Sequence, residues 1–371
     1  MPVPLLDLKA QHATIRDDVV SAVMRVVDDQ SFILGAPVGK LECEVAGLSR
    51  TRFAIGCANG TDALIIAMRA LDIGRGDEVI TAPFTFFATA GTIHNLGAKP
   101  VFVDIDPVTY NIDPDAIAAA ITPRTKAVIP IDLFGQMAPI ERVAMAARGL
   151  PVIEDAAQSI GARRAIDGEW RMAGEVATIG TLSFFPSKNL GAWGDAGMMV
   201  TQDERLAQRM LKLRTHGGIK TYYHEEVGYN SRIDALQAAV LSAKLPHLAQ
   251  WSQRRRENAA YYTAALGGLS DVGTPVVAPE NESIFNQYTI RVRSGRRDAL
   301  QQHLKAKGIG TSIYYPLPLH LQPCFAYLGY KEGQLLESER ASKEVISLPI
   351  YPELTRVQLD EVVAAVREFF A

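Results

Sequence analysis

Cysteine is scarce in this sequence. Its 371 residues contain three cysteines, Cys43, Cys57 and Cys324, and no two of them form a CxxC pair. An odd, widely spaced set of this kind excludes a disulfide framework and the cysteine clusters that hold zinc. We therefore expect a protein of a reducing compartment.

The sequence also lacks an excess of positive charge and any long apolar run. Lys and Arg total 38 against 41 Asp and Glu, and the formal net charge is −3, so nothing indicates nucleic acid or an acidic membrane as partner. The densest basic run, three arginines at 254–256, lies in a predicted helix beside Glu257, and we expect a solvated helix face there. No apolar stretch approaches the roughly 18–20 residues that span a bilayer, and the N-terminus turns polar within a few residues, unlike a secretory signal. We expect a cytoplasmic protein.

Between residues 53 and 201 the sequence alternates short β-rich apolar runs with helical segments. This alternation predicts an α/β fold with a mostly parallel sheet covered by helices on both faces. The runs at 177–185 and 197–202 have no long helix between them, so we expect part of the sheet to be antiparallel. Long helical segments follow to about residue 266, and Pro246 is predicted to kink or break them.

A smaller α/β unit is predicted after these helices. Its expected elements are a strand at 286–292, a helix at 296–308, a strand at 309–315 and a C-terminal helix at 355–370. We assign residues 1–250, with the N-terminal segment, to a large domain and residues 251–371 to a small one. The boundary is expected between about 245 and 270.

Ligands in open α/β sheets bind beyond the carboxyl ends of strands, and the first suggestive strand end is "ANGTDAL", 58–64. Gly60 allows a tight turn there, and Thr61 and Asp62 open a helix whose free N–H groups and dipole suit a phosphate. Alternatively, Thr61 simply caps the helix.

The second strand end, "APFTFFATA" at 82–90, brings three aromatic residues to a helix start. One of them is suited to stack on a flat heteroaromatic ring, but each is equally suited to the core.

The third strand end is "VIEDAAQSIGA", 152–162. A carboxylate at the end of a buried strand, such as Asp155, is costly without a partner. A protonated pyridine nitrogen is such a partner, and an Asp–pyridinium pair tunes pyridoxal phosphate (PLP). Gln158, three residues on, is able to bond another ring substituent. The alternative is that Asp155 caps a following helix.

The fourth is "TLSFFPSKNLGAWGDAG", 181–197, which contains Lys188. A lysine becomes a nucleophile only where its amine loses its proton, in a desolvated or cation-rich site. The Phe-Phe-Pro run before it supplies an apolar wall, while Ser183 and Ser187 offer hydroxyls for a phosphate. The alternative is an ordinary surface lysine.

Together these segments resemble the DegT/DnrJ/EryC1/StrS family of PLP-dependent nucleotide-sugar aminotransferases, which have the aspartate-aminotransferase (PLP-transferase fold type I) architecture. The resemblance runs in the family's order from residue 57 to residue 323. It is carried by "CANGTDAL", "APFTFFATA", "IEDAAQSIGA", "SFFPSKNLG", "GDAG", "GYNSRIDALQAA" and "YYPLPLHLQP".

By this resemblance Lys188 bonds pyridoxal 5'-phosphate and shuttles the substrate proton, and Asp155 keeps the pyridine nitrogen protonated. Gln158 is expected to contact the ring hydroxyl and Phe86 to stack on the ring. The residues expected at the coenzyme phosphate are Gly60, Thr61, Asp62 and Ser183, together with Asn230 of the neighbouring subunit. The resemblance thus implies a homodimer with shared active sites.

The resemblance also implies the substrates. L-glutamate, which leaves as 2-oxoglutarate, would aminate a nucleotide-linked keto sugar, with a 3-oxo sugar favoured over a 4-oxo sugar. The product would enter a surface polysaccharide or a glycosylated small molecule. His216, Arg232 and His320 match segments that line the sugar-nucleotide site, although His216 also suits a loop hydrogen bond and Arg232 an interface salt bridge. No metal site is expected, because the other histidines show no ligand spacing.

Two alternatives remain at this point. Some members of the family are PLP-dependent sugar dehydratases, in which the reactive lysine is typically replaced by histidine. Lys188 therefore favours transamination. The second alternative is a non-catalytic, PLP-binding regulatory protein.

Overall fold

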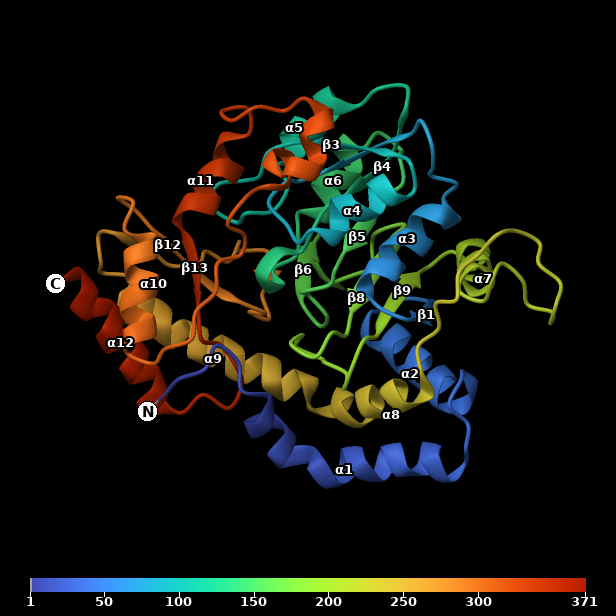
Figure 1. The fold of residues 1–371 in the computed structure, drawn as a ribbon, viewed down its shortest axis with the longest axis horizontal. Helices are drawn as coiled ribbons and strands as arrows, with labels where there is room; N and C mark the ends of the chain where they lie inside the picture. Colours follow the sequence, from blue (N-terminus) through green and yellow to red (C-terminus); the bar gives the residue numbers. More distant parts are fainter. Residues whose placement is uncertain (1) are drawn as a thin grey trace.

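The computed structural model describes residues 2–371, and its larger part is built on a mixed sheet (Figure 1). The strands are β1 (Phe53–Cys57), β2 (Glu78–Thr81), β3 (Lys99–Phe102), β4 (Thr125–Ile129), β5 (Ile153–Asp155), β8 (Ile179–Ser183) and β9 (Gly197–Thr201). They form two groups of paired strands, in the orders β1-β9-β8-β5 and β3-β2-β4. Isolated bridges between the β4 and β5 segments join the two groups. Only β9 runs antiparallel to its neighbours, which confirms a mostly parallel sheet with an antiparallel part.

Helices cover both faces of this sheet. They are α1 (Leu8–Asp28), α2 (Gly35–Leu48), α3 (Gly60–Ala70), α4 (Ala88–Asn95), α5 (Pro114–Ala120), α6 (Ile140–Ala146), α7 (Glu204–Leu213) and α8 (Ala235–Lys244). In β9, Met198 and Val200 pack in a core with α1, α2 and α8, while Met199 packs on the other face with α3 and α7. Strands buried on both faces therefore read as continuous apolar runs in the sequence.

A second core lies at the left of Figure 1, around an antiparallel sheet of order β10-β12-β13. Its elements are β10 (Val272–Gly273), β12 (Tyr288–Val292), β13 (Val345–Leu348), α9 (Leu248–Leu266), α10 (Arg297–Ala306) and α12 (Arg356–Phe370). The helix α11 (Leu336–Glu344) lies beside them and packs through Ala341 into the first core. Val3 packs into this core and forms a parallel bridge with Ile309. The N-terminal segment thus begins against the second core, although the sequence assigned it to the large domain; the domain boundary itself stays a prediction.

One predicted break is confirmed and one predicted strand is wrong. Pro246 lies in a short 3-10 segment, η2 (Leu245–His247), between α8 and α9. The segment 309–315 is not a strand, because it forms isolated bridges and no continuous ladder. Ile309 bridges to Val3, and Ser312 bridges to Ser347 at the outer edge of β13.

The expected solvated face at 254–256 is wrong at its middle residue. Arg254 and Arg256 pair with Glu257 and Glu282 near the surface, but Arg255 is only 3% exposed. Successive residues of an α-helix point about 100° apart, so three consecutive side chains do not share a face.

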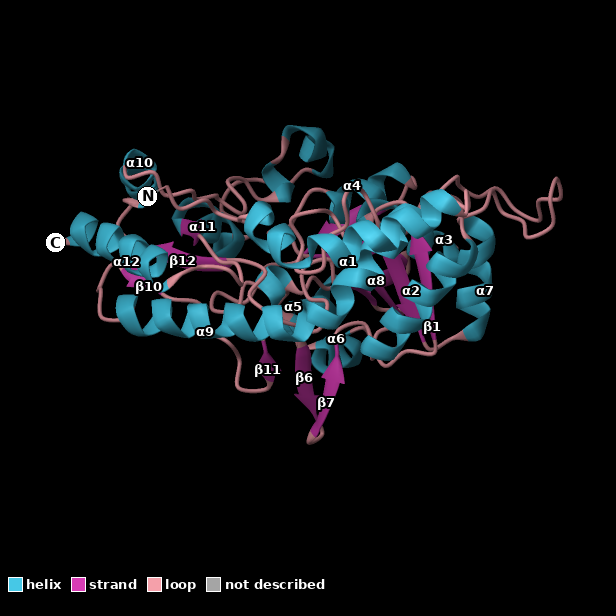
Figure 2. Cartoon of the chain, turned by 90° about the horizontal axis from the view of Figure 1, so that it is seen from below, coloured by secondary structure: helices cyan, strands magenta, loops and turns pink. Residues whose placement is uncertain are grey.

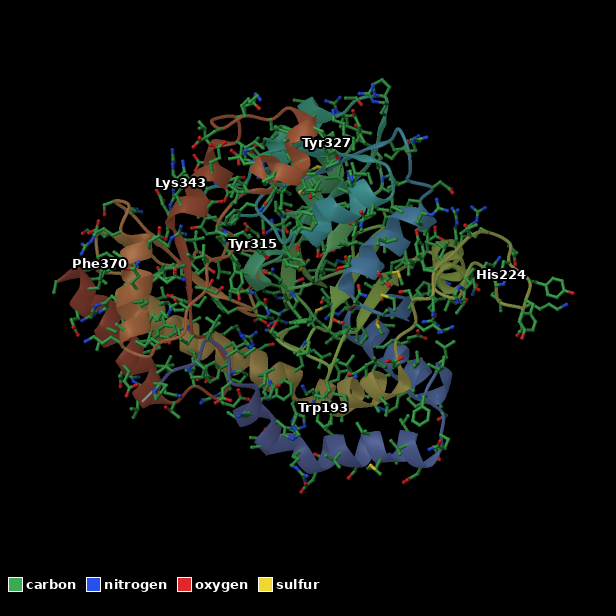
Figure 3. The ribbon with its side chains drawn as sticks, viewed as in Figure 1. Trp193, His224, Tyr315, Tyr327, Lys343 and Phe370 are labelled. Atoms are coloured by element: carbon green, nitrogen blue, oxygen red, sulfur yellow. The ribbon has the colours of Figure 1, made fainter. Side chains whose placement is uncertain are left out.

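The remaining elements are short, and the one that holds Leu133 and Phe134 is buried in the first core. They are β6 (Arg163–Ile166), β7 (Glu169–Met172), β11 (Asn281–Glu282), η1 (Leu133–Gly135), η3 (Leu319–Leu321) and η4 (Pro323–Leu328). Figure 2 shows the β6–β7–β11 sheet extending below α9. The loop between α7 and α8 extends away from the rest of the chain, with His224 near its tip (Figure 3). Among residues 2–371, no helix is both long enough and apolar enough to cross a bilayer.

Candidate active site

The ends of β1, β8 and β5 meet at one edge of the sheet, where they build a tight cradle. Gly197, at the start of β9, pairs with Cys57 of β1 on one side and with Ser183 of β8 on the other. A Cβ added at Gly197 would lie 2.3 Å from the Asn59 carbonyl, and one added at Gly60 would lie 2.7 Å from Cβ of Ser183. Glycine at these two positions therefore permits the backbones to approach.

The start of α3 supplies an anion site in this cradle. Asn59 caps the helix, because its Oδ1 accepts a hydrogen bond of 2.9 Å from the Asp62 N–H; the alternative of a Thr61 cap is wrong. Among residues 2–371, the N–H groups of Gly60 and Thr61 have no hydrogen-bond partner. With the helix dipole they suit a phosphate. Gly60, Thr61, Asp62 and Ser183 are thus together, and their contact with a coenzyme phosphate stays a prediction.

Asp155 ends β5 as a buried carboxylate. It is 6% exposed, its Oδ2 accepts a 2.8 Å hydrogen bond from Thr89 Oγ1, and its Oδ1 accepts one of 3.3 Å from the Ala157 N–H. Burial raises the pKa of Asp155, while these hydrogen bonds and the charge of Lys188 oppose the rise. No helix follows, so Asp155 is not a helix cap. Within the described chain it makes no ion pair, which leaves it suited to a cationic ligand atom.

Lys188 lies in the loop that follows β8. The loop is tight: a Cβ at Gly191 would lie 2.3 Å from the Pro186 carbonyl, and Lys244 of α8 donates a 2.7 Å hydrogen bond to the Gly191 carbonyl. Burial lowers the pKa of Lys188, and the negative charge of Asp155 opposes this. An amine with a lowered pKa is more often unprotonated near neutral pH, as a nucleophile must be. The alternative of an ordinary surface lysine is therefore disfavoured.

The three phenylalanines of "APFTFFATA" have different surroundings. Phe84 is a core residue at 1% exposure, and Phe87 stacks on Phe325 with ring centroids 5.6 Å apart. Phe86 is 60% exposed just before α4. Of the three, Phe86 is the ring left free to stack on a flat ligand.

Gln158 already uses both ends of its amide. Its Oε1 accepts a 2.7 Å hydrogen bond from the Phe134 N–H, and its Nε2 donates a 3.2 Å hydrogen bond to the Tyr315 hydroxyl. Figure 3 shows Tyr315 between the two cores. One N–H of Gln158 remains for a ligand, so its predicted contact with a ring hydroxyl stays a prediction.

Three of the predicted substrate and interface residues border the projecting loop. The backbone of His216 bonds the Tyr229 carbonyl at 2.8 Å while its ring stays exposed. Asn230 is exposed at the base of the loop, opposite Thr215. Arg232 is half-buried and has no ion pair or hydrogen bond with any residue of 2–371. These positions are compatible with a ligand or a second subunit, and their roles stay predictions.

His320 differs from these residues because its side chain is buried. It is 2% exposed in η3, and its Nε2 lies 3.1 Å from Oε1 of Glu339. Burial lowers the pKa of His320, while Glu339 opposes the shift. Its Nδ1 is buried with no partner in the described chain. The predicted substrate contact of His320 is untested by this arrangement.

Several residues of the site were missed by the sequence analysis. Asn59 was findable, because an Asn directly before a helical run is a common N-cap. Thr89 was not, since its bond to Asp155 joins residues 66 positions apart. Asp132 and Glu154 are two buried carboxylates near Asp155 that affect each other's pKa, and they depend equally on tertiary contacts.

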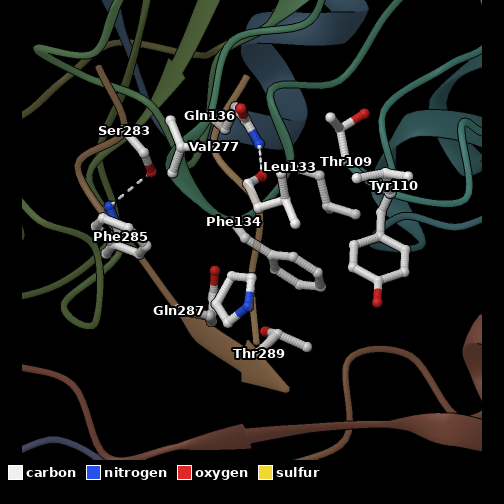
Figure 4. Close-up of a pocket in the computed structure, with 13 residues that line it drawn as sticks. Thr109, Tyr110, Leu133, Phe134, Gln136, Val277, Ser283, Phe285, Gln287 and Thr289 are labelled. Atoms are coloured by element: carbon white, nitrogen blue, oxygen red, sulfur yellow. Dashed lines mark hydrogen bonds between the residues drawn. The ribbon is translucent and has the colours of Figure 1, made fainter. Parts of the chain in front are cut away.

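A separate small cavity lies between η1 and β12 (Figure 4). Phe134 and Tyr110 face Gln287 and Thr289 across it, and Ser283 Oγ accepts a hydrogen bond from the Phe285 N–H at its side. Its volume of about 20 Å³ holds about one water molecule. It is therefore no substrate site.

The residues present fit pyridoxal phosphate. The glycine cradle with free N–H groups suits its phosphate, exposed Phe86 suits its ring, and Asp155 is a buried carboxylate that lacks a cation. Lys188 offers a desolvated amine on the same edge. Among residues 2–371, no group of three or more His, Cys, Asp or Glu side chains is placed to hold a metal ion.

Comparisons with known proteins agree with this arrangement. The model of the DegT/DnrJ/EryC1/StrS aminotransferase family matches residues 13–367. A Geobacillus stearothermophilus protein described as a pleiotropic regulatory protein is 52% identical, over 100% of this chain and 99% of its own. UDP-N-acetyl-3-dehydro-alpha-D-glucosamine 3-aminotransferase of Acidithiobacillus ferrooxidans is 45% identical, over 98% of this chain and 97% of its own.

Solved structures are similar across nearly the whole chain. S. venezuelae DesV in complex with a ketimine intermediate superposes with a TM-score of 0.96 at 42% identity, over 99% of this chain and 98% of its own. NtdA from Bacillus subtilis, with bound cofactor PMP, superposes with a TM-score of 0.89 at 30% identity, over 99% of this chain and 83% of its own. The fold is therefore the type I fold of PLP-dependent aminotransferases.

Proposed function

The chain belongs to the DegT/DnrJ/EryC1/StrS family of PLP-dependent nucleotide-sugar aminotransferases, and we propose that it converts a 3-oxo sugar nucleotide to the 3-amino sugar nucleotide with L-glutamate as donor. The observation that carries the proposal is the half-buried Lys188 and the buried Asp155 at one sheet edge. Lys188 has its pKa lowered by burial and Asp155 has its pKa raised by burial, and each opposes the shift of the other. An amine poised to lose its proton beside a carboxylate that lacks a cation is the pair that PLP chemistry requires.

Each residue of the site has a distinct task in this proposal. Bound pyridoxal phosphate supplies an aldehyde that bonds amines and a protonated ring that accepts electron density. Lys188 Nζ takes the α-proton of the amino donor and moves it to the adjacent carbon of the bound coenzyme. The lowered pKa of Lys188 permits this near neutral pH. Asp155 keeps the ring nitrogen protonated, and Thr89 holds the Asp155 carboxylate in place through the 2.8 Å hydrogen bond. Gly60, Thr61, Asp62 and Ser183 hold the phosphate, Phe86 covers the ring, and Gln158 meets the ring hydroxyl.

The acceptor is proposed to carry its keto group at position 3. The support is likeness: the Acidithiobacillus ferrooxidans relative, at 45% identity over nearly the whole chain, is described as acting on a 3-dehydro sugar nucleotide. His216, Arg232 and His320 bind the sugar nucleotide in this proposal. The unpaired Arg232 guanidinium suits an anionic group of that substrate.

The proposed assembly is a homodimer in which Asn230 reaches the phosphate of the partner subunit. The support lies in the projecting loop between α7 and α8 (Figure 1). Its apolar side chains are unusually bare: Ile219 is 68% exposed, Tyr222 91% and Val227 84%. Exposed apolar groups on one segment are typical of an interaction surface.

The test is a coupled assay of purified holoenzyme with L-glutamate and a panel of 3-oxo and 4-oxo sugar nucleotides. The expected products are 2-oxoglutarate and a sugar nucleotide with the mass change of amination, formed fastest from 3-oxo acceptors. Borohydride is expected to fix the coenzyme to Lys188, and Lys188→Ala to abolish turnover, while Lys331→Ala at an exposed position leaves it unchanged.

Other results would favour the alternatives. Loss of water from the sugar without use of glutamate would identify a dehydratase. Coenzyme binding without turnover of any acceptor would favour a regulatory role, which the description of the Geobacillus stearothermophilus relative raises. Wild-type rates in Lys188→Ala would refute the mechanism.

A further inference from the structure

Arg255 is a buried cation that the proposed reaction has not used. It lies in α9 at 3% exposure, and no carboxylate of residues 2–371 lies within ion-pair distance of it. Its Nη1 donates hydrogen bonds to three backbone carbonyls, of Phe285 at 3.1 Å, Asn286 at 3.4 Å and Ile350 at 2.9 Å. Within the described chain, Nε and Nη2 have no hydrogen-bond partner.

The charge of Arg255 is incompletely compensated. Burial lowers its pKa to about 10, and the only acidic side chain that opposes this is Glu353, which acts through space. Buried charges in proteins are normally paired or bound to a ligand. A guanidinium with free donors in a desolvated place binds carboxylates well, because its planar fork matches their two oxygens.

Arg255 lines a cavity of about 80 Å³, together with Ser187, Asn286, Gln287 and Tyr314. No Asp or Glu lines it. Oδ1 of Asn286 and Oε1 of Gln287 are buried without hydrogen-bond partners in residues 2–371. A guanidinium on a wall that carries no carboxylate fits a ligand that brings a carboxylate of its own.

The cavity lies against the loop that carries Lys188. Ser187 precedes Lys188 directly, and Asn286 Nδ2 donates a 2.7 Å hydrogen bond to Oδ1 of Asn189, the residue after it. Both flanks of the reactive lysine thus contact the walls of this cavity. The cavity therefore adjoins the loop of the reactive lysine.

We propose that this cavity is the carboxylate site of the amino donor and that Arg255 is its anchoring cation. The inference rests on the proposed function for the identity of the donor as an amino acid. It assigns donor binding to α9 and the segment before β12, apart from the residues proposed for the sugar nucleotide.

The test measures the affinity of the holoenzyme for glutarate, a dicarboxylate without an amine, by titration calorimetry. Arg255→Lys is expected to weaken glutarate binding about tenfold or more, because the bidentate fork is lost. Since Arg255 also holds three carbonyls, Gln287→Glu provides a second, isosteric variant that puts a negative charge on the cavity wall. It is expected to weaken glutarate at least as much. Arg254→Lys and Gln302→Glu, both at exposed positions, are the matched controls.

The KM of each substrate gives a second readout. In both variants the KM for L-glutamate is expected to rise about tenfold or more, with the affinity for the sugar nucleotide nearly unchanged. Wild-type protein that does not bind glutarate, unchanged affinity in both variants, or equal loss for donor and sugar would overturn the proposal. If glutarate binding depends on Arg255 but no acceptor is ever aminated, the proposed function fails and the carboxylate site stands.

Discussion

Replacing Asp132 by Asn is expected to change how the stability of the protein depends on pH. Asp132 and Glu154 are both fully buried, and each carboxyl group affects the pKa of the other. Asp132 also accepts hydrogen bonds from the Ala138 N–H at 2.8 Å and from Ser159 Oγ at 2.7 Å. An Asn at this position keeps an acceptor for Ala138 and gains a donor toward Glu154, without a group that titrates.

The magnitude follows from the pKa of Asp132. Burial raises it from 3.8 to about 6, against the interaction with Glu154 and the hydrogen bonds from Ala138 and Ser159. Between these values the folded state holds more protons than the unfolded state, so the free energy of unfolding falls as pH rises from about 4 to about 6. The loss is about 3 kcal/mol above pH 6. For 371 residues the entropy of unfolding is roughly 0.8 kcal/mol/K, so the loss corresponds to about 4 °C in Tm.

The assay is thermal unfolding of the holoenzyme between pH 4 and pH 8. Wild type is expected to lose about 4 °C more than Asp132→Asn over this range. Removing the Asp132 charge also lets the raised pKa of Glu154 fall, which adds to the difference in the same direction. Other titrating groups are common to both proteins and cancel, and Asp115→Asn at an exposed position controls for the substitution. Parallel Tm profiles of wild type and Asp132→Asn would refute the reasoning.

Two further predictions concern the coenzyme site. Gly197→Ala is expected to weaken PLP binding at least about tenfold, because its Cβ would overlap the Asn59 carbonyl at 2.3 Å; a titration of coenzyme absorbance measures this, and Gly39→Ala, where a Cβ meets nothing within 4 Å, should leave it unchanged. Asp155→Asn keeps an acceptor for Thr89 and should hold Tm nearly constant, but kcat is expected to fall about 100-fold or more with the loss of the charge; a kcat within a factor of two of wild type would exclude the proposed role of Asp155.

The sequence was informative about the site where function lies in short segments. Asp155 lies at the end of a buried strand, and Lys188 lies just after the end of another. Strand ends can be predicted from local patterns of apolar residues and glycine. Parallel strands then bring those ends to one edge, which explains why separate motifs meet. Thr89 and Arg255 lie outside this logic, because their partners are distant in sequence: Asp155 for Thr89, and carbonyls of 285, 286 and 350 for Arg255.

The fold was predictable in the same uneven way. The strand at 53–57 and the break at Pro246 follow from local patterns, and the structure contains both. The strand expected at 309–315 has the right composition and meets the outer edge of β13, but it pairs there only between Ser312 and Ser347. Strand formation requires continuous pairing with a partner as well as a β-rich segment, and that pairing is not visible in any one segment.

The arginine run at 254–256 shows why local composition misleads for single residues on a helix. The composition of three consecutive arginines predicts a solvent-exposed segment. In a helix, however, each side chain points about 100° away from the preceding one. One member of such a run therefore faces the interior when the helix packs against a core, as α9 packs against the second core. The interior residue must then bond carbonyls, pair with a carboxylate or bind a ligand, because a desolvated guanidinium is otherwise costly. Arg255 bonds three carbonyls through Nη1 alone, and the free donors on Nε and Nη2 are the reason to expect a carboxylate ligand beside it.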